Sequence, residues 1–170
     1  HLPKETIELF ELLPTETSWQ LIWRGCAESA VIESGARQPM FNDVALTADG
    51  GFYTTEMYNI MTPFEQVAAA GVEVKDTGVV WHWTADGGFA PVAGSSGSFP
   101  NGIVINDAED TLYVNYWFSG LTIKLDINTG DVLAKHQGGR ADNLTLVDGA
   151  VWAAKHDMTF MEYAEGCPAD

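Results

Sequence analysis

Residues 41–46 read FNDVAL, and a similar pattern returns as PNGIVI at residues 100–105 and as ADNLTL at residues 141–146. Each copy has an asparagine ahead of an alternating apolar strand, then a polar turn, then a strand that joins an aliphatic to an aromatic residue. The asparagines, at positions 42, 101 and 143, are 59 and 42 residues apart. A unit that recurs at such intervals indicates a fold built from several similar sheets.

The rest of the chain also has the pattern of short β-strands. Apolar and polar residues alternate with a period of two in about a dozen runs rich in β-branched and aromatic residues, such as 6–10 and 79–83. The turn sequence TADGG occurs at 47–51 and again at 84–88, and Asp-Gly favours tight hairpins. Only residues 63–70 have the pattern of a short helix. The sequence therefore predicts an all-β chain with antiparallel neighbours.

The spacing of the repeat is typical of the blades of a β-propeller, which have four strands each. A helical insert at 61–71 explains the longer first interval. The strands make about three blades, whereas propellers close with four to eight. Residues 1–170 are therefore interpreted as part of a larger propeller, with blades missing on one or both sides. The alternative, a self-sufficient β-sandwich, does not explain the repeated asparagine.

The chain is strongly acidic, with 24 Asp and Glu against 8 Lys and Arg and a formal net charge of −16. This balance argues against nucleic acid and anionic membranes as partners, and it is compatible with a cation such as calcium. No apolar run reaches the roughly 20 residues of a membrane-spanning helix, and no signal peptide is visible. Cys26 and Cys167 either pair or are isolated thiols. His82, between two tryptophans, is interpreted as an exposed or edge histidine.

The repeated asparagine has two interpretations. Asn and Asp cap turns with their own side chains, which is the simpler explanation for any single copy. In a radial fold, however, the first strands of successive sheets begin near one central point. The asparagines at 42 and 101 would then converge with the pair Asp142–Asn143. Amide and carboxylate oxygens together form a site that suits calcium better than zinc.

Three motifs follow one another in the chain: FNDV at 41–44, FPNGI at 99–103 with LYV at 112–114, and DNL at 142–144 with VWAAKH at 151–156. In this order they resemble the paraoxonase/arylesterase branch of the SMP-30, gluconolactonase and strictosidine synthase superfamily. The resemblance extends from residue 1 to about residue 163. It implies a six-bladed β-propeller that uses calcium to hydrolyse lactones and aryl esters.

The resemblance also implies a set of site residues. Four of them match the ligands of a catalytic calcium: Asn42, Asn101, Asp142 and Asn143. Asp43 matches a ligand of a second, structural calcium. His156 corresponds to a histidine in the wall of the active site, and His1 to one member of the family's histidine pair. The family takes a further acidic ligand from an N-terminal strand, and that residue has no counterpart here.

Together these residues predict a calcium-dependent lactonase or arylesterase whose substrate is a small lactone or ester. Calcium would polarise the carbonyl group and a histidine would activate water, while Phe99 and Trp117 would form an apolar wall. For Trp117, simple sheet packing is the alternative. The remaining propeller blades would come from the parent chain. Two other functions stay open: a non-catalytic binding propeller stabilised by calcium, and a sugar-lactone hydrolase of the gluconolactonase type, which would favour polar pocket residues.

Overall fold

The computed structural model describes residues 6–12, 19–26 and 38–156, and within these ranges the chain consists of twelve strands and one α-helix. The strands before the helix are β1 (Thr6–Leu12), β2 (Trp19–Cys26), β3 (Pro39–Leu46) and β4 (Phe52–Asn59). The helix α1 spans Phe64–Val72. The strands after it are β5 (Val80–Thr84), β6 (Gly88–Pro91), β7 (Pro100–Ile105), β8 (Thr111–Tyr116), β9 (Leu121–Asp126), β10 (Val132–Gln137), β11 (Arg140–Val147) and β12 (Ala150–His156).

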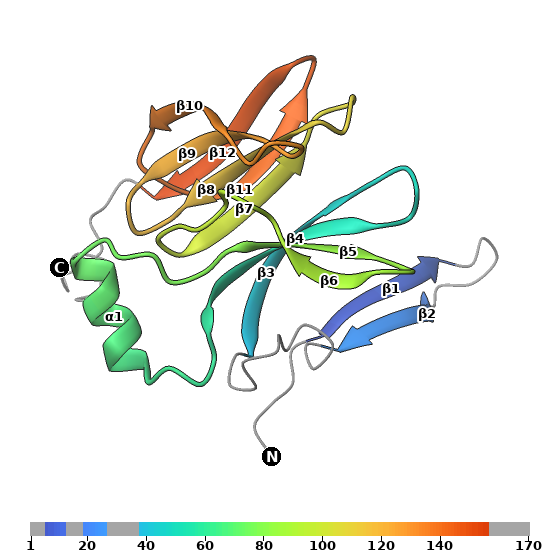
Figure 1. Ribbon diagram of the computed structural model, residues 1–170, viewed down its shortest axis with the longest axis horizontal. Helices are drawn as coiled ribbons and strands as arrows, with labels where there is room; N and C mark the ends of the chain where they lie inside the picture. The colour runs from blue at the N-terminus through green and yellow to red at the C-terminus, as the bar shows by residue number, and fades with distance from the viewer. Residues whose placement is uncertain (1–5, 13–18, 27–37, 157–170) are drawn as a thin grey trace, which may run out of the picture.

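The strands form four separate antiparallel sheets, as Figure 1 shows. Two of them are four-stranded, with the orders β3-β4-β5-β6 and β7-β8-β9-β10, so each strand pairs with the next one in the chain. The other two are the hairpins β1-β2 and β11-β12. The predicted all-β class and antiparallel neighbours are confirmed, and none of the described sheets closes on itself.

The main hydrophobic core lies between the two four-stranded sheets. Its buried residues come from both sheets: Ala45, Tyr53, Val80, Ile103, Leu112, Val114, Tyr116, Ile123 and Leu125. Burial alternates along β9, as the period of two predicts for a strand with one face in the core, whereas β8 is buried on both faces. Burial of these side chains is the largest favourable contribution to folding.

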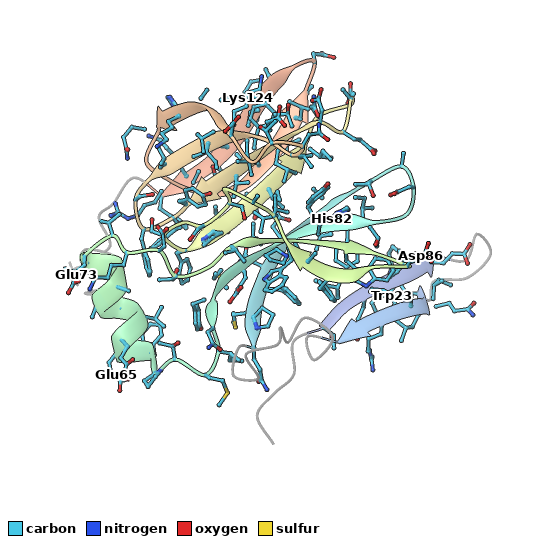
Figure 2. The ribbon with its side chains drawn as sticks, in the orientation of Figure 1. Trp23, Glu65, Glu73, His82, Asp86 and Lys124 are labelled. Atoms are coloured by element: carbon cyan, nitrogen blue, oxygen red, sulfur yellow. The ribbon has the colours of Figure 1, made fainter. Side chains whose placement is uncertain are left out.

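The β1-β2 hairpin packs through its aromatic side chains on the inner strands β4 and β5 of the first four-stranded sheet. The ring of Trp23 lies 4.6 Å from that of Trp83 and 5.9 Å from that of Phe52, measured between centroids. Figure 2 labels Trp23 on this hairpin and Asp86 in the turn between β5 and β6.

Helix α1 is inserted between β4 and β5, where the sequence predicts it. Pro63 precedes its first residue, a position where the missing amide N–H costs no helical hydrogen bond. Val67 is buried against Trp117 and Phe118, whereas Glu65 is exposed. The helix therefore covers one end of the second four-stranded sheet with its apolar side. Within the described ranges, no helix has both the length and the apolar character needed to cross a bilayer.

The structure corrects the interpretation of His82. It lies on β5, which is an inner strand of its sheet, and its ring stacks on that of Tyr53 with centroids 4.2 Å apart. His82 is labelled in Figure 2. Burial lowers the pKa of the His82 imidazole, and the nearby carboxylate of Asp49 opposes that shift. Cross-strand stacking on Tyr53, which depends on register, is the reason the side chain is not exposed.

This environment predicts a pH-dependent contribution to stability. Below about pH 6.5 the unfolded chain binds a proton at this imidazole more readily than the folded chain does, so the free energy of unfolding decreases as the pH falls through that value. We expect the melting temperature to fall less between pH 7.5 and pH 5 in His82→Phe, which keeps the stack on Tyr53, than in the wild type. Equal falls in the two proteins would contradict this assignment.

Candidate functional site

The three repeated motifs lie at the same kind of irregularity in their strands. The pairing register shifts between Phe41 and Val44 in β3, between Pro100 and Ile103 in β7, and between Ala141 and Leu144 in β11. The residue pairs 42–43, 101–102 and 142–143 therefore all fall within a β-bulge. Bulges redirect side chains and are common beside active sites. In each motif, the regular pairing of the strand with its neighbour is interrupted at the polar residues.

The three motif strands lie next to one another although they belong to different sheets. The Asp43 carboxylate accepts a hydrogen bond from the backbone N–H of Ile103, with an N···O distance of 3.0 Å. The hydroxyl of Thr55 donates to the backbone carbonyl of Asn101 over 2.6 Å. Gly102 packs directly against the backbone of residues 142–143. These contacts fix β7 between β3 and β11.

A pocket of about 230 Å³ opens beside β7 and β11. Five residues that the sequence analysis singled out lie in its wall: Phe99, Asn101, Trp117, Asp142 and His156. Helix α1 and the turn after β8 complete it with four apolar residues: Phe64, Val67, Ala68 and Phe118. The pocket therefore combines a large apolar wall with an amide, a carboxylate and an imidazole, which is the usual composition of a small-molecule site.

Phe99 reaches this wall through a strained backbone. Its φ angle is +62°, in the left-handed region that a bulky residue seldom adopts. Both of its backbone groups are held, since its N–H donates to the Thr77 hydroxyl at 2.8 Å and its carbonyl accepts from the N–H of Trp117 at 3.0 Å. The ring packs on Phe118 with centroids 4.5 Å apart. Strain of this kind, held in place by its surroundings, is most often found at functional sites.

Asn101 provides the most unusual polar group of the pocket. The residue is 5% exposed, and its side-chain oxygen Oδ1 is buried with no hydrogen-bond partner among the described residues. A buried carbonyl oxygen without a partner is costly, at about 1–3 kcal/mol, and calls for a ligand that binds it. Calcium binds amide and carboxylate oxygens. The pair formed by Asn101 and Asp142 in one wall therefore fits the calcium that the family resemblance implies.

The other predicted calcium ligands do not line this pocket. Asn42 is exposed, and its side-chain amide lies 3.5 Å from the sulfur of Met57. Both carboxylate oxygens of Asp43 accept backbone hydrogen bonds, from Val44 and from Ile103. Asn143 is exposed. Among the described residues, no three His, Cys, Asp or Glu side chains gather as a metal-binding group. His1 lies outside the described residues.

Trp117 and His156 are joined directly. The indole Nε1–H of Trp117 donates to Nδ1 of His156 across 3.2 Å, and the two rings are nearly perpendicular. The guanidinium of Arg140 lies over the indole ring, 5.8 Å from its centroid. The role of Trp117 therefore goes beyond packing within the sheet, since its indole forms part of the pocket wall and also holds His156.

Several residues of the site were not identified from the sequence. The apolar lining from α1 was missed because a short helix by itself gives no indication of what it covers. Phe118 and Arg140 belong to no motif. The strained backbone at position 99 leaves no mark in composition or periodicity. The only available signal was the position of the helical insert, which falls inside the first repeat interval.

No protein-family model matches this sequence, and the search of curated proteins also found no match. Among solved structures, the chain is similar to a gluconolactonase from Xanthomonas campestris, with 18% sequence identity and a TM-score of 0.51. The similarity covers 70% of this chain and 42% of that one.

Two further structures align with lower scores. The computationally designed protein Ika8 has 13% identity and a TM-score of 0.40, with 68% of this chain and 43% of the other covered. A protein from Lactobacillus plantarum has 16% identity and a TM-score of 0.39, with 79% and 38% covered. The chain thus spans about two-fifths of the length of the solved structures it matches. At 18% identity the first of the three similarities shows the fold alone, which is an all-β, propeller-type fold.

Proposed function

We propose that this chain is part of a calcium-dependent hydrolase of lactones or esters. The observation that carries the proposal is the buried Oδ1 of Asn101, which has no hydrogen-bond partner in the described part of the chain and lies in the wall of a mostly apolar pocket with Asp142 and His156. The gluconolactonase fold neighbour supports lactone hydrolysis at the level of reaction class. The paraoxonase branch and its arylesterase activity belong to this proposal as well.

Asn101 and Asp142 would hold the catalytic calcium from the pocket wall, and Asn42 and Asn143, which the resemblance implies as further ligands, would bind it from outside that wall. When bound, the ion supplies Lewis-acid polarisation of a carbonyl oxygen. Amide ligands carry no charge, so they leave more of the positive charge available than carboxylates would. Asp43 would serve a second, structural calcium, and its carboxylate already ties β3 to β7.

The apolar wall would hold the carbon skeleton of the substrate. Phe99, Trp117 and Phe118 form one packed group against which an alkyl or aryl portion can lie, with the ester group turned toward Asn101, Asp142 and His156. Displacing water from such a surface favours binding and strengthens the polar interactions inside the pocket. A histidine, His156 or His1, would assist the attack of water on the carbonyl carbon.

Calcium removal gives the first test. We expect the protein to hydrolyse a simple aliphatic lactone such as δ-valerolactone in a pH-stat assay with calcium present, and to lose that activity with chelator. The melting temperature should fall with chelator too, by an amount that grows with the calcium concentration used for comparison, because a ligand bound only to the folded state stabilises it. A melting curve indifferent to chelator would count against any calcium site.

The substrate class can be decided in the same assay. Gluconolactone tests the activity of the fold neighbour, and phenyl acetate tests arylesterase activity. The apolar composition of the wall favours the aliphatic lactone and the aryl ester over the sugar lactone. Preference for gluconolactone would favour the sugar-lactone alternative, and silence on all three substrates with intact calcium binding would favour a non-catalytic binding propeller.

We further propose that the sheets of this chain are blades of a six-bladed propeller. The two meanders β3–β6 and β7–β10 have the four-stranded topology of blades, and β7 adjoins both β3 and β11. Residues 1–170 would form part of that domain, and the remaining blades of the parent chain would cover the open sheet edges. If the full-length parent unfolds in a single two-state transition and loses its calcium in that same transition, the result would agree with this arrangement.

A further inference from the structure

The hydrogen bond between Trp117 and His156 constrains where the imidazole carries its proton. An indole Nε1–H is a donor only, so the ring nitrogen that it contacts must be an acceptor. That nitrogen is Nδ1, at 3.2 Å. A neutral imidazole has one protonated and one unprotonated nitrogen, and the proton therefore belongs to Nε2.

The indole donor is held firmly in place. Trp117 is 6% exposed, and its ring packs on Phe118 and Phe99 with centroids 5.8 and 6.0 Å away. Arg140 lies over its face, and Arg140 is also the cross-strand partner of His156 in the β11-β12 pair. Moving the proton of the imidazole to Nδ1 would place two N–H donors against each other, and turning the indole away would break its packing on Phe99 and Phe118.

We propose that Trp117 is a positioning residue that holds His156 in the Nε2–H tautomer, so that His156 meets the substrate as a hydrogen-bond donor and not as the base that activates water. The donor would be directed at the carbonyl oxygen, where negative charge develops as water adds. No proton needs to leave the histidine for this interaction. The identity of the ligand in this inference rests on the proposed lactone or ester hydrolysis. The assignment of the tautomer does not depend on that proposal.

Other charged groups surround the imidazole. Arg140 faces it from β11, Lys155 precedes it on β12, and Asp142 shares the pocket wall. Of these, only the Asp142 carboxylate is an acceptor, and the donor from Trp117 occupies Nδ1. Because Trp117 occupies the one acceptor nitrogen of the neutral ring, a donor at Nε2 is compatible with these neighbours.

The tautomer can be measured without any activity. In a protein labelled with ¹⁵N at histidine, long-range ¹H–¹⁵N spectra distinguish a protonated Nε2 from a protonated Nδ1. The imidazole signals that disappear in His156→Gln are those of His156. We expect the Nε2–H form for His156 at neutral pH, and a mixture of the two forms in Trp117→Phe, which keeps an aromatic ring and removes the donor. A protonated Nδ1 in the wild type would overturn the inference.

Two substitutions at His156 separate a donor from a base. In His156→Gln the side-chain oxygen can accept from the Trp117 indole while the amide N–H₂ donates, but the side chain cannot act as a base. We expect it to keep δ-valerolactone hydrolysis within about tenfold of the wild type, whereas His156→Ala should lose about 100-fold or more. If His156 were the base, both variants would lose about 100-fold or more, and that result would overturn the donor role.

A double-substitution cycle tests the role of Trp117. If Trp117 acts by fixing the tautomer, Trp117→Phe should lower kcat in the wild type but have little further effect in His156→Gln, which has no tautomer to lose. If the losses in kcat from Trp117→Phe and His156→Gln multiply in the double variant, Trp117 acts only as part of the pocket wall, and its positioning role is overturned. Absence of any lactone hydrolysis in the wild type would refute the proposed function, and the NMR result would then still decide the tautomer.

Discussion

Replacing Asn101 with alanine is expected to abolish the response of the protein to calcium. In wild type, saturating calcium at about 100 times its Kd should raise the free energy of unfolding by about 2.7 kcal/mol, and hence the melting temperature by about 5–10 °C. The variant lacks the buried oxygen that fits the ion, so its melting temperature should be the same with calcium as with chelator. Activity on δ-valerolactone should fall by about 100-fold or more.

The same substitution should behave differently when chelator is present. Asn101 Oδ1 is then buried without a partner, which costs about 1–3 kcal/mol, and alanine removes that cost while losing some packing. We therefore expect Asn101→Ala to be about as stable as wild type in chelator and clearly less stable in calcium. Differential scanning calorimetry under both conditions measures the two differences.

Asn128→Ala provides the matched control, because Asn128 is an exposed residue in the turn between β9 and β10. It should keep both the calcium response and the activity. If Asn101→Ala were destabilised equally in calcium and in chelator, Asn101 would have a packing role only, and the assignment of its oxygen to the ion would be wrong.

Replacing Gly102 with alanine is expected to have the largest effect on the fold around the site. A methyl group at this position would overlap the backbone carbonyl of Asp142 and lie 2.8 Å from the Cα atom of Asn143. The obstacle is backbone on a neighbouring sheet, so β7 and β11 would have to move apart. We expect a loss of about 2–3 kcal/mol in the free energy of unfolding, measured by urea denaturation.

Activity and calcium response should fall with it even at temperatures where the variant is folded, because β7 and β11 carry Asn101 and Asp142 on adjacent backbones. Gly138→Ala makes the same chemical change where the new methyl would meet only the imidazole end of His136, an exposed side chain that can move. That variant should be close to wild type. Similar losses for the two would show that the close approach at Gly102 is not what holds the site.

Both predictions concern residues of the bulge in β7. The polar residues of the three motifs lie at bulges, and a bulge can place its side chains in a common site only if neighbouring backbones approach closely. Gly102 permits that approach between β7 and β11, and the Asp43 carboxylate fixes the corresponding distance between β3 and β7. The fold and the site are therefore expected to fail together when either contact is lost.

The sequence by itself determined the class of fold and most of its elements. Alternation with a period of two placed the described strands, and the TADGG turns placed two of the hairpins, because side-chain direction and turn conformation depend on residues close together in the chain. The helix was found for the same reason, since Pro63 and the residues after it set its start locally. The repeated motif and the family resemblance together also indicated which residues would approach one another. Five of them, including Asn101 and His156, line one pocket.

Only the tertiary structure decided what those residues do within the site. The hydrogen bond from Trp117 to His156 joins residues 39 positions apart, and the unpartnered oxygen of Asn101 is defined by what surrounds it in space. His82 was misjudged for a similar reason, since its burial depends on stacking against a residue of the neighbouring strand. The separation of Asn42 and Asn143 from the pocket wall was equally invisible in the motif. Local patterns encode where strands and turns form, whereas burial, tautomer and strain depend on contacts between distant segments, which exist only once the sheets have packed.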